Sequence, residues 1–431
     1  MKMKLLLLEL NEINCRHVRS YVDKGHLPVL GALLDEHGTS QTLSEQRYEE
    51  LEPWIQWVTA HTGRSFAEHG IFRLGDIVNH DIPQIWEELE EHGLKVGAIS
   101  PMNAKNRTKA AAFFVPDPWT PATLTARPLL KRLYAAVAQA VNDNAQSRLT
   151  PASLVWLAAG AAVYARPVNY GRYLSLFRAT RTKPWTKAMF LDQLLADIFI
   201  RETRRTDPDF ATLFLNAGAH IQHHYMFSSA AYGGPQKNPD WYVAEGIDPV
   251  LEVYQLYDRV VGQLRAAFPN SRLMIATGLH QDPHPELTYY WRLKDHAAFL
   301  RRLEVPFLRV EPRMSRDFLI TCASADDAVR AAAILASAQA EDGVELFEVD
   351  NRGPDIFAML TYPNEIDDKL TYTVGNRRYE GLKDDVAFVA IKNGQHNGIG
   401  YFVDTGVVKG THPPEFQLAE LPQKIKTALS V

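Results

Sequence analysis

The segment that decides the fold is KLLLLELNEINCRHVRSYVDKGHLPVL, residues 4–30. Its opening apolar run is typical of a strand buried in a parallel sheet. The strand delivers Asn11 and Glu12 to its C-terminal end, and a helix then carries the chain away. Ligand groups of α/β proteins gather beyond the carboxyl ends of the strands, so this amide and this carboxylate stand where a metal-binding aspartate is often found.

The same alternation of strand and helix patterns continues along the chain. Further strand-like runs are KVGAIS (95–100), ATLFLNA (211–217), RLMIATG (272–278) and VAFVAI (386–391). This order predicts an α/β fold with a central, mostly parallel sheet flanked by helices. We expect a core of residues 1–125, 200–300 and 376–431, a helical insertion at 126–199 and a small α+β cap at 300–375.

Composition excludes several classes of protein. The 431 residues carry a formal net charge of −5, so nothing favours nucleic-acid binding. Only two cysteines are present, which rules out a disulfide framework and predicts a reducing, cytoplasmic location. No run reaches the roughly 18 to 20 apolar residues needed to span a bilayer, and the first apolar run is too short for a signal peptide.

Two neighbouring stretches within residues 151–185 leave a peripheral membrane contact open. LVWLAAGAAVYA (154–165) is apolar, and RPVNYGRYLSLFRATRTK (166–183) is basic and aromatic. Their ordinary interpretations are a buried helix and a solvated helix surface. The alternatives are a helix that lies on a membrane and a surface that meets an anionic headgroup or a phosphorylated ligand.

Polar side chains follow several of the predicted strands. The segments GAHIQHHYM (218–226), TGLHQDPH (277–284) and NGQHNGIG (393–400) each come directly after a strand-like run. Parallel strands would bring these segments to one edge of the sheet. On a helix, His220 and His224 share a face, which is the spacing that lets two imidazoles bind one metal ion.

Motifs spread over most of the chain resemble those of a known family. They are KGHLPVLGALLDEHG (24–38), WVTAHTGRSFAEHGIF (57–72), IWEELEEHGLKVGAIS (85–100), IQHHYMF (221–227), DPVLEVYQLYDRVVGQL (248–264) and NGQHNGIGYF (393–402). Their order and spacing resemble the type I phosphodiesterase/nucleotide pyrophosphatase branch of the alkaline phosphatase superfamily. The resemblance implies an alkaline-phosphatase-like core.

The resemblance also implies a site that this chain has altered. Family members hold two metal ions, usually zinc, with aspartates and histidines around a Thr or Ser nucleophile. His223, His280 and His396 fall on family histidine ligands, whereas the aspartate positions hold Asn11, Ala219 and Leu279. The nucleophile position holds Pro53, which has no hydroxyl group.

Charge arguments limit what such a site can bind. Two divalent cations about 4 Å apart repel each other and need several carboxylates nearby. We therefore expect at most one Zn²⁺, with His223, His280, His396 and Glu12 as candidate ligands. Glu52, Gln56 and Asn11 are the candidate catalytic residues, with Glu52 as general base or additional ligand.

Aromatic and histidine side chains near these segments are candidates for substrate binding. They are Trp54, Trp57, His220, His224 and Tyr225. The sequence favours a divergent hydrolase or transferase of a phosphate-type ester on a glycan, lipid or nucleotide-like substrate. A non-catalytic binding or accessory protein, and a metal-independent acid/base enzyme that uses Glu52 and the histidines, are the alternatives. The sequence does not indicate an oligomeric state.

Overall fold

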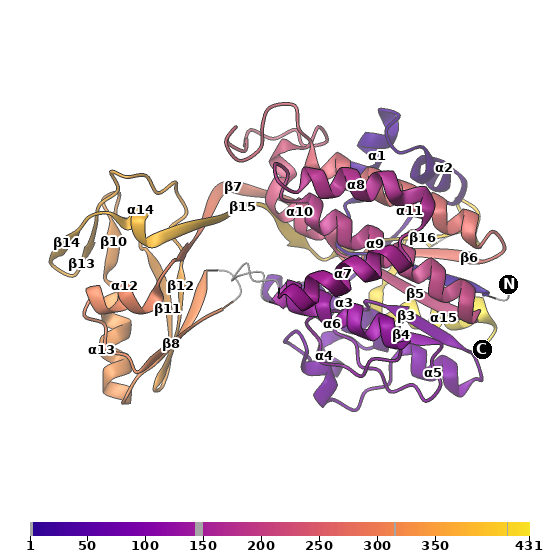
Figure 1. Ribbon diagram of the computed structural model, residues 1–431, viewed down its shortest axis with the longest axis horizontal. Coiled ribbons are helices and arrows are strands. Elements are labelled where there is room, and N and C mark those ends of the chain that lie inside the picture. The colour runs from indigo at the N-terminus through magenta and orange to yellow at the C-terminus, as the bar shows by residue number, and fades with distance from the viewer. Residues whose placement is uncertain (1–2, 143–149, 314–315, 412) are drawn as a thin grey trace. The chain divides into compact units, whose positions relative to one another are not determined.

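The computed structural model describes residues 3–142, 150–313, 316–411 and 413–431 (Figure 1). The chain divides into two compact units. The first consists of Met1–Gly234, Pro239–Pro283 and Gly394–Val431, and the second of Pro235–Asn238 and His284–Asn393. The second unit contains the span 300–375 expected as a cap, together with residues 284–299 and 376–393 that we expected in the core.

The first unit is built on an eight-stranded sheet with the order β17-β2-β16-β6-β1-β5-β3-β4. β1 (Leu5–Leu10) is central and runs parallel to both β5 (Phe210–Leu215) and β6 (Arg272–Ala276). Only β16 runs antiparallel to its neighbours in this sheet, which confirms the mostly parallel arrangement. The other strands are β2 (Ser40–Leu43), β3 (Val96–Ile99), β4 (Phe113–Val115), β16 (Ile399–Asp404) and β17 (Glu415–Gln417).

Side chains of β1 alternate between two apolar cores, as the two-residue period of a strand requires. Leu6, Leu8 and Leu10 lie in one core, which includes buried residues of α1 (Cys15–Asp23), α2 (Pro28–His37), α9 (Thr186–Thr206), α10 (Ala217–Tyr225) and α11 (Pro249–Ala267). Leu5 and Leu7 lie in the other, with residues of α3 (Pro53–Thr62), α5 (Ile85–Glu91) and α15 (Leu421–Leu429). Helices therefore cover both faces of the sheet (Figure 1).

The predicted helical insertion contains α6 (Pro128–Asn142), α7 (Pro151–Tyr164), α8 (Tyr170–Ala179) and most of α9, and no strand among its described residues. Residues 143–149 of the insertion lie outside the described residues. Leu133, Tyr164 and Leu176 join the core that contains Leu8, so these helices are part of the first unit. None of the described helices is long and apolar enough to cross a bilayer.

The second unit has its own small sheets. One is four-stranded with the order β11-β12-β9-β8, and another is three-stranded with the order β10-β13-β14. Its elements are β8 (Arg309–Pro312), β9 (Asp317–Thr321), β10 (Ala338–Ala340), β11 (Phe347–Arg352), β12 (Asp355–Leu360), β13 (Tyr372–Val374) and β14 (Arg377–Tyr379), with α12 (His296–Arg302), α13 (Ala325–Ala336) and α14 (Leu382–Asp385).

One predicted core strand proves not to belong to the central sheet. The run VAFVAI lies in β15 (Val386–Asn397), which pairs with β7 (His280–Leu293) in a separate two-stranded sheet. Within this run Ala387 and Phe388 are only partly buried and Val389 is exposed, unlike the fully buried β1 and β5, because a two-stranded ribbon cannot be covered as a central sheet is. His280 at the start of β7 and His396 near the end of β15 belong to the first unit.

Because β1 occupies the centre of the sheet, shortening one of its core side chains should destabilise the whole first unit. Leu8 is fully buried, so Leu8→Ala should lower the free energy of unfolding by about 2–5 kcal/mol. The matched control is Leu174→Ala on α8, where the side chain is 50% exposed and a change within about 0.5 kcal/mol is expected. Urea denaturation followed by circular dichroism measures both, and equal effects would contradict the central role of β1.

Candidate metal centre

The turn after β1 places Glu12 in an unusual backbone conformation. Its φ angle is +60°, in the left-handed region that non-glycine residues rarely occupy. The backbone N–H of Glu12 donates to Thr277 O at 3.1 Å, and that of Asn11 donates to Leu215 O at 3.1 Å. These bonds tie the turn to the ends of both neighbouring strands, so the surrounding structure holds Glu12 in this conformation.

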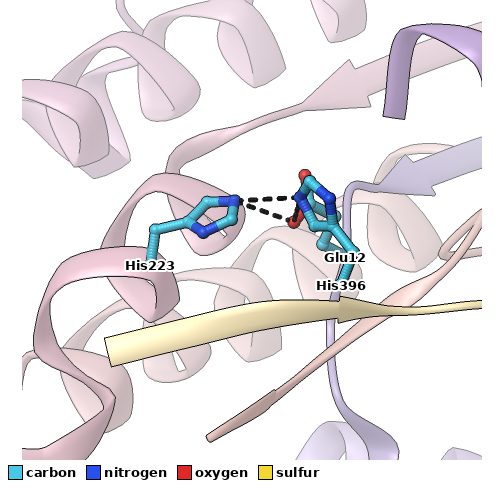
Figure 2. A group of neighbouring side chains, drawn as sticks. All are labelled: Glu12, His223 and His396. Carbon is cyan, nitrogen blue, oxygen red and sulfur yellow. Dashed lines mark hydrogen bonds and ion pairs between the residues drawn. The ribbon is translucent and has the colours of Figure 1, made fainter. Parts of the chain in front are cut away.

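Glu12 meets two histidines from distant parts of the chain. His223 lies on α10, the helix after β5, and His396 lies near the end of β15 (Figure 2). Oε2 of Glu12 is 3.2 Å from Nε2 of each histidine, and the two Nε2 atoms are 3.2 Å apart. Three ligand atoms therefore converge on one point.

The carboxylate of Glu12 is buried and fully engaged. Nδ2 of Asn11 donates to its Oε1 at 3.1 Å, and Nε2 of Gln281 donates to its Oε2 at 2.5 Å. Burial alone raises the pKa of Glu12, but the charges and hydrogen bonds of His396 and His223 outweigh burial and hold this pKa well below its usual range. Glu12 is therefore an anion at neutral pH.

The three side chains fit one divalent metal ion. Two imidazoles and one carboxylate form a ligand set of catalytic zinc sites, which leave a position open for water. Ligand atoms about 2.1 Å from a tetrahedral ion lie roughly 3.4 Å apart, close to the 3.2 Å separations here. The side chain of His223 is 30% exposed, so the group is reachable from solvent.

The chain lacks carboxylates at the positions where the resemblance would place ligands of a second ion. The positions that the resemblance assigns to further carboxylates hold Ala219 and Leu279, both buried and apolar, and Asn11. The Asn11 amide is already engaged, because it accepts from Trp57 Nε1 at 2.7 Å and donates to Asn216 Oδ1 at 2.8 Å. No negative charge is therefore available from these positions to offset a second cation.

The structure does not bring His280, a predicted ligand, into this group. Its ring contacts Ile399 O through Nδ1 at 2.5 Å, and its Nε2 lies 3.2 Å from Asp282 Oδ1 and 3.1 Å from Arg16. The hydrogen bond with His280 lowers the pKa of Asp282 to about 2 despite burial. Side chains alternate along β7, so Gln281 reaches Glu12 while His280 points away.

The predicted catalytic residues take different places. Glu52 is the N-cap residue of α3, and its Oε2 lies 3.8 Å from Nδ1 of His396, on the side of the ring away from Glu12. Gln56 is fully buried and donates to Glu50 O at 2.8 Å, so it braces the start of α3. Asn11 orients Glu12, as described above.

The predicted substrate-binding residues also separate. Trp57 is fully buried, and Tyr225 is stacked on Tyr242 within the core, so packing and not ligand contact accounts for both. Trp54 is half-buried and donates to Phe72 O at 3.0 Å. His224 lies beside the site, with its ring centroid 6.3 Å from that of His223 and 5.0 Å from that of His220.

Sequence reasoning missed two glutamines that complete the site. Gln281 donates to Glu12, and Gln222 donates to the backbone O of Glu12 at 2.8 Å while accepting from Tyr254 OH at 2.7 Å. Each glutamine is next to a histidine that the motifs singled out, His280 or His223. Their adjacency to those histidines was the available signal, because neighbouring positions on a strand or a helix point in different directions.

A mostly parallel sheet that presents a carboxylate and two imidazoles near its carboxyl edge is an arrangement of metal-dependent α/β enzymes. Residues 18–280 match the family model for type I phosphodiesterase / nucleotide pyrophosphatase. The chain therefore belongs to this family. The matched span includes His223 but neither Glu12 nor His396.

Several solved structures resemble the chain over nearly its whole length. Phosphonoacetate hydrolase from Sinorhizobium meliloti 1021, in complex with phosphonoformate, shares 12% identity with a TM-score of 0.47, and the match covers 99% of this chain and 96% of that one. Murine ectonucleotide pyrophosphatase / phosphodiesterase 5 shares 10% identity with a TM-score of 0.42, covering 100% and 95%. A search of curated proteins found no match.

The geometry predicts one bound divalent ion per chain and its dependence on the two histidines. Metal content, measured by elemental analysis of protein purified without a histidine tag or chelator, should fall strongly in His223→Ala and in His396→Ala because each change removes one of three protein ligands. His92→Ala is the control, since His92 is exposed and bonds only to Glu88 O among its described contacts. Undiminished metal in both site variants would contradict the assignment.

Proposed function

We propose that this protein is a phosphoester hydrolase or transferase that works with at most one divalent ion, most suitably Zn²⁺, at Glu12, His223 and His396. The observation that carries the proposal is the 3.2 Å triangle of ligand atoms, which is open to solvent at His223. Membership of the type I phosphodiesterase / nucleotide pyrophosphatase family supports a phosphoester as the bond attacked.

A bound ion would polarise a phosphoryl oxygen and lower the pKa of a coordinated water. The residues of the chain supply the remaining requirements. Asn11 and Gln281 fix the two oxygens of Glu12, so that the carboxylate keeps one orientation. Such outer contacts commonly change metal affinity or activity by about 10–100-fold when removed.

Direct attack by water is the mechanism that the residues around α3 support. Pro53 is the first residue of the helix and offers no nucleophile. The nearby hydroxyls are engaged and buried, because Thr59 Oγ1 lies 3.2 Å from His69 Nε2 and Thr62 Oγ1 donates to Val58 O at 2.7 Å. A covalent phosphoenzyme at these positions is therefore not part of the proposal.

Glu52 is the acidic residue best placed to assist. Its side chain is 33% exposed, and it approaches the nitrogen of His396 that does not face Glu12. A carboxylate in that place holds the imidazole of a metal ligand in one tautomer and orientation. The same exposure leaves Glu52 able to accept a proton from water, so we assign it either or both of these roles.

The family and the site geometry do not specify the alcohol that leaves when the phosphoester is cleaved. We propose a glycan, lipid or nucleotide-like alcohol. Of the residues first expected to bind it, His220 and His224 are beside the site, whereas Trp57 and Tyr225 are packed in the core.

A metal-independent acid/base site is the second candidate, and one observation favours it. Both carboxylate oxygens of Glu12 already have partners, which are Asn11, Gln281 and the two histidines. A carboxylate that is paired with a protonated imidazole needs no metal ion to neutralise its charge. Elemental analysis separates the two candidates, because activity in protein without any bound metal would support the second.

Glu52→Gln keeps the shape of the side chain and removes its charge. With a generic phosphodiester such as bis(p-nitrophenyl) phosphate, turnover should fall by about 10²-fold if Glu52 moves a proton. If Glu52 only orients His396, metal affinity should fall about 10-fold or more alongside activity. Glu49→Gln is the matched control, because Glu49 is exposed three residues earlier. Full activity and unchanged metal affinity would contradict both roles.

The absence of a hydroxyl at position 53 predicts a reaction without a covalent intermediate. Acid quenching during turnover, followed by intact-mass spectrometry, should reveal only unmodified chain, and product should form without an initial burst. Pro53→Thr tests the position, since the hydroxyl would stand at the first residue of α3. A phosphorylated wild-type chain would contradict the proposed mechanism.

A further inference from the structure

A second polar pocket lies on the face of the first unit formed by α8, α9 and α11. It encloses about 260 Å³ and has none of the residues of the Glu12 site in its walls. Arg172, Ser175, Leu176 and Ala179 line it from α8, and these positions share one flank of that helix. The remaining walls come from Lys183, from Thr186 and Met189 of α9, and from Glu252, Gln255 and Arg259 of α11.

The pocket gathers more positive charge than it neutralises. Glu252 is the one carboxylate among its lining residues, and it accepts from Lys183 Nζ at 2.5 Å and from Trp185 Nε1 at 2.8 Å. Neither Arg172 nor Arg259 forms an ion pair within the described parts of the chain. The guanidinium groups of Arg172 and Arg259 thus line the same pocket, and neither is in an ion pair with a carboxylate of the described residues.

The protein around Arg172 disfavours its positive charge. Its Nε is buried and has no hydrogen-bond partner among the described residues. Burial, together with repulsion from Arg259, lowers the pKa of Arg172 to about 10. Asp258, the neighbour of Arg259, is turned toward α2, where it accepts from the N–H of Leu30 at 2.8 Å.

We propose that this pocket is a binding site for a phosphate-bearing anion, with Arg172 and Arg259 as the two ligands that clamp it. A dianion between them would remove the repulsion and supply acceptors for their unused N–H groups. Ser175 and Gln255 add neutral donors at the same walls. The proposal stands on α8 and α11 alone and does not depend on the function assigned to the Glu12 site.

Two sources could provide the same phosphomonoester. One is a soluble phosphorylated metabolite. The other is a lipid headgroup, because the opposite flank of α8 exposes Tyr170, Leu174 and Phe177 at helical spacing, each at least half exposed. The chemistry recognised by the arginines is shared, and separate probes distinguish the sources.

The test is calorimetric titration of the full chain, treated with chelator so that the Glu12 site holds no metal. Inorganic phosphate and glycerol 3-phosphate are the soluble probes. Arg172→Gln and Arg259→Gln should each weaken binding about 10-fold or more, since each removes charged hydrogen bonds to the anion. Arg178→Gln, an exposed position on α8 outside the pocket, is the matched control and should bind as the wild type does.

A variant that should tighten phosphate binding excludes misfolding as the explanation for weaker binding by the arginine variants. Glu252→Gln removes the only negative charge in the pocket walls, so phosphate should bind several-fold more tightly. Sedimentation with phosphatidylcholine vesicles, with and without phosphatidic acid, tests the lipid source. Binding to phosphatidic acid vesicles that requires Arg172 assigns the lipid, and binding to the soluble probes alone assigns a metabolite. Failure of wild type to bind any probe, or binding by both arginine variants that is as tight as that of the wild type, would overturn the proposal.

Discussion

A charged carboxylate buried at the end of the central strand is the constraint on which the site depends. Glu12 cannot remain ionised inside the protein without partners, because desolvation of an unpaired charge is costly. Its two oxygens receive Asn11, Gln281, His223 and His396. Each partner comes from a different strand end or helix, so satisfying one charge brings together the end of β1, α10 and the residues of β7 and β15 that belong to the first unit.

The same strand sets the position of α3 from its other face. Glu9 accepts from His61 Nε2 at 3.0 Å and from Thr212 at 2.8 Å, and Asn11 accepts from Trp57. His61 and Trp57 are both on α3. These contacts fix α3 against β1 and β5, and Glu52, the N-cap residue of α3, lies 3.8 Å from the imidazole ring of His396. Glu9, which forms a buried pair with His61, lies two residues before Asn11 along the chain, so this pair stabilises the part of the sheet that carries the Glu12 site.

The sequence was sufficient for the mostly parallel sheet, and three of the four residues it named as candidate ligands, Glu12, His223 and His396, lie together in the structure. Apolar runs and their order predict parallel strands because burial on both faces requires continuous hydrophobic segments. His280 failed for a local reason, since the strand period turned Gln281 and not His280 toward Glu12. Trp57 and Tyr225, predicted to bind substrate, are both buried, because an aromatic residue near a site can equally fill the core beneath it, and residue type does not distinguish these roles. The pattern of VAFVAI also could not show which sheet the strand joins. Its sequence is apolar, but its place in the two-stranded sheet depends on its pairing with β7.

The three ligand atoms come from residues 12, 223 and 396, which lie near the beginning, in the middle and near the end of the chain. During synthesis the first strand and α10 can emerge and fold well before the last ligand leaves the ribosome, since domains tend to fold as their sequence appears. Until then Glu12 has only part of its set of partners. Capture of the proposed ion would therefore come late in biogenesis, once all three side chains are present. A nascent chain that ends before residue 396 would leave Glu12 with His223 as its one imidazole partner from this group.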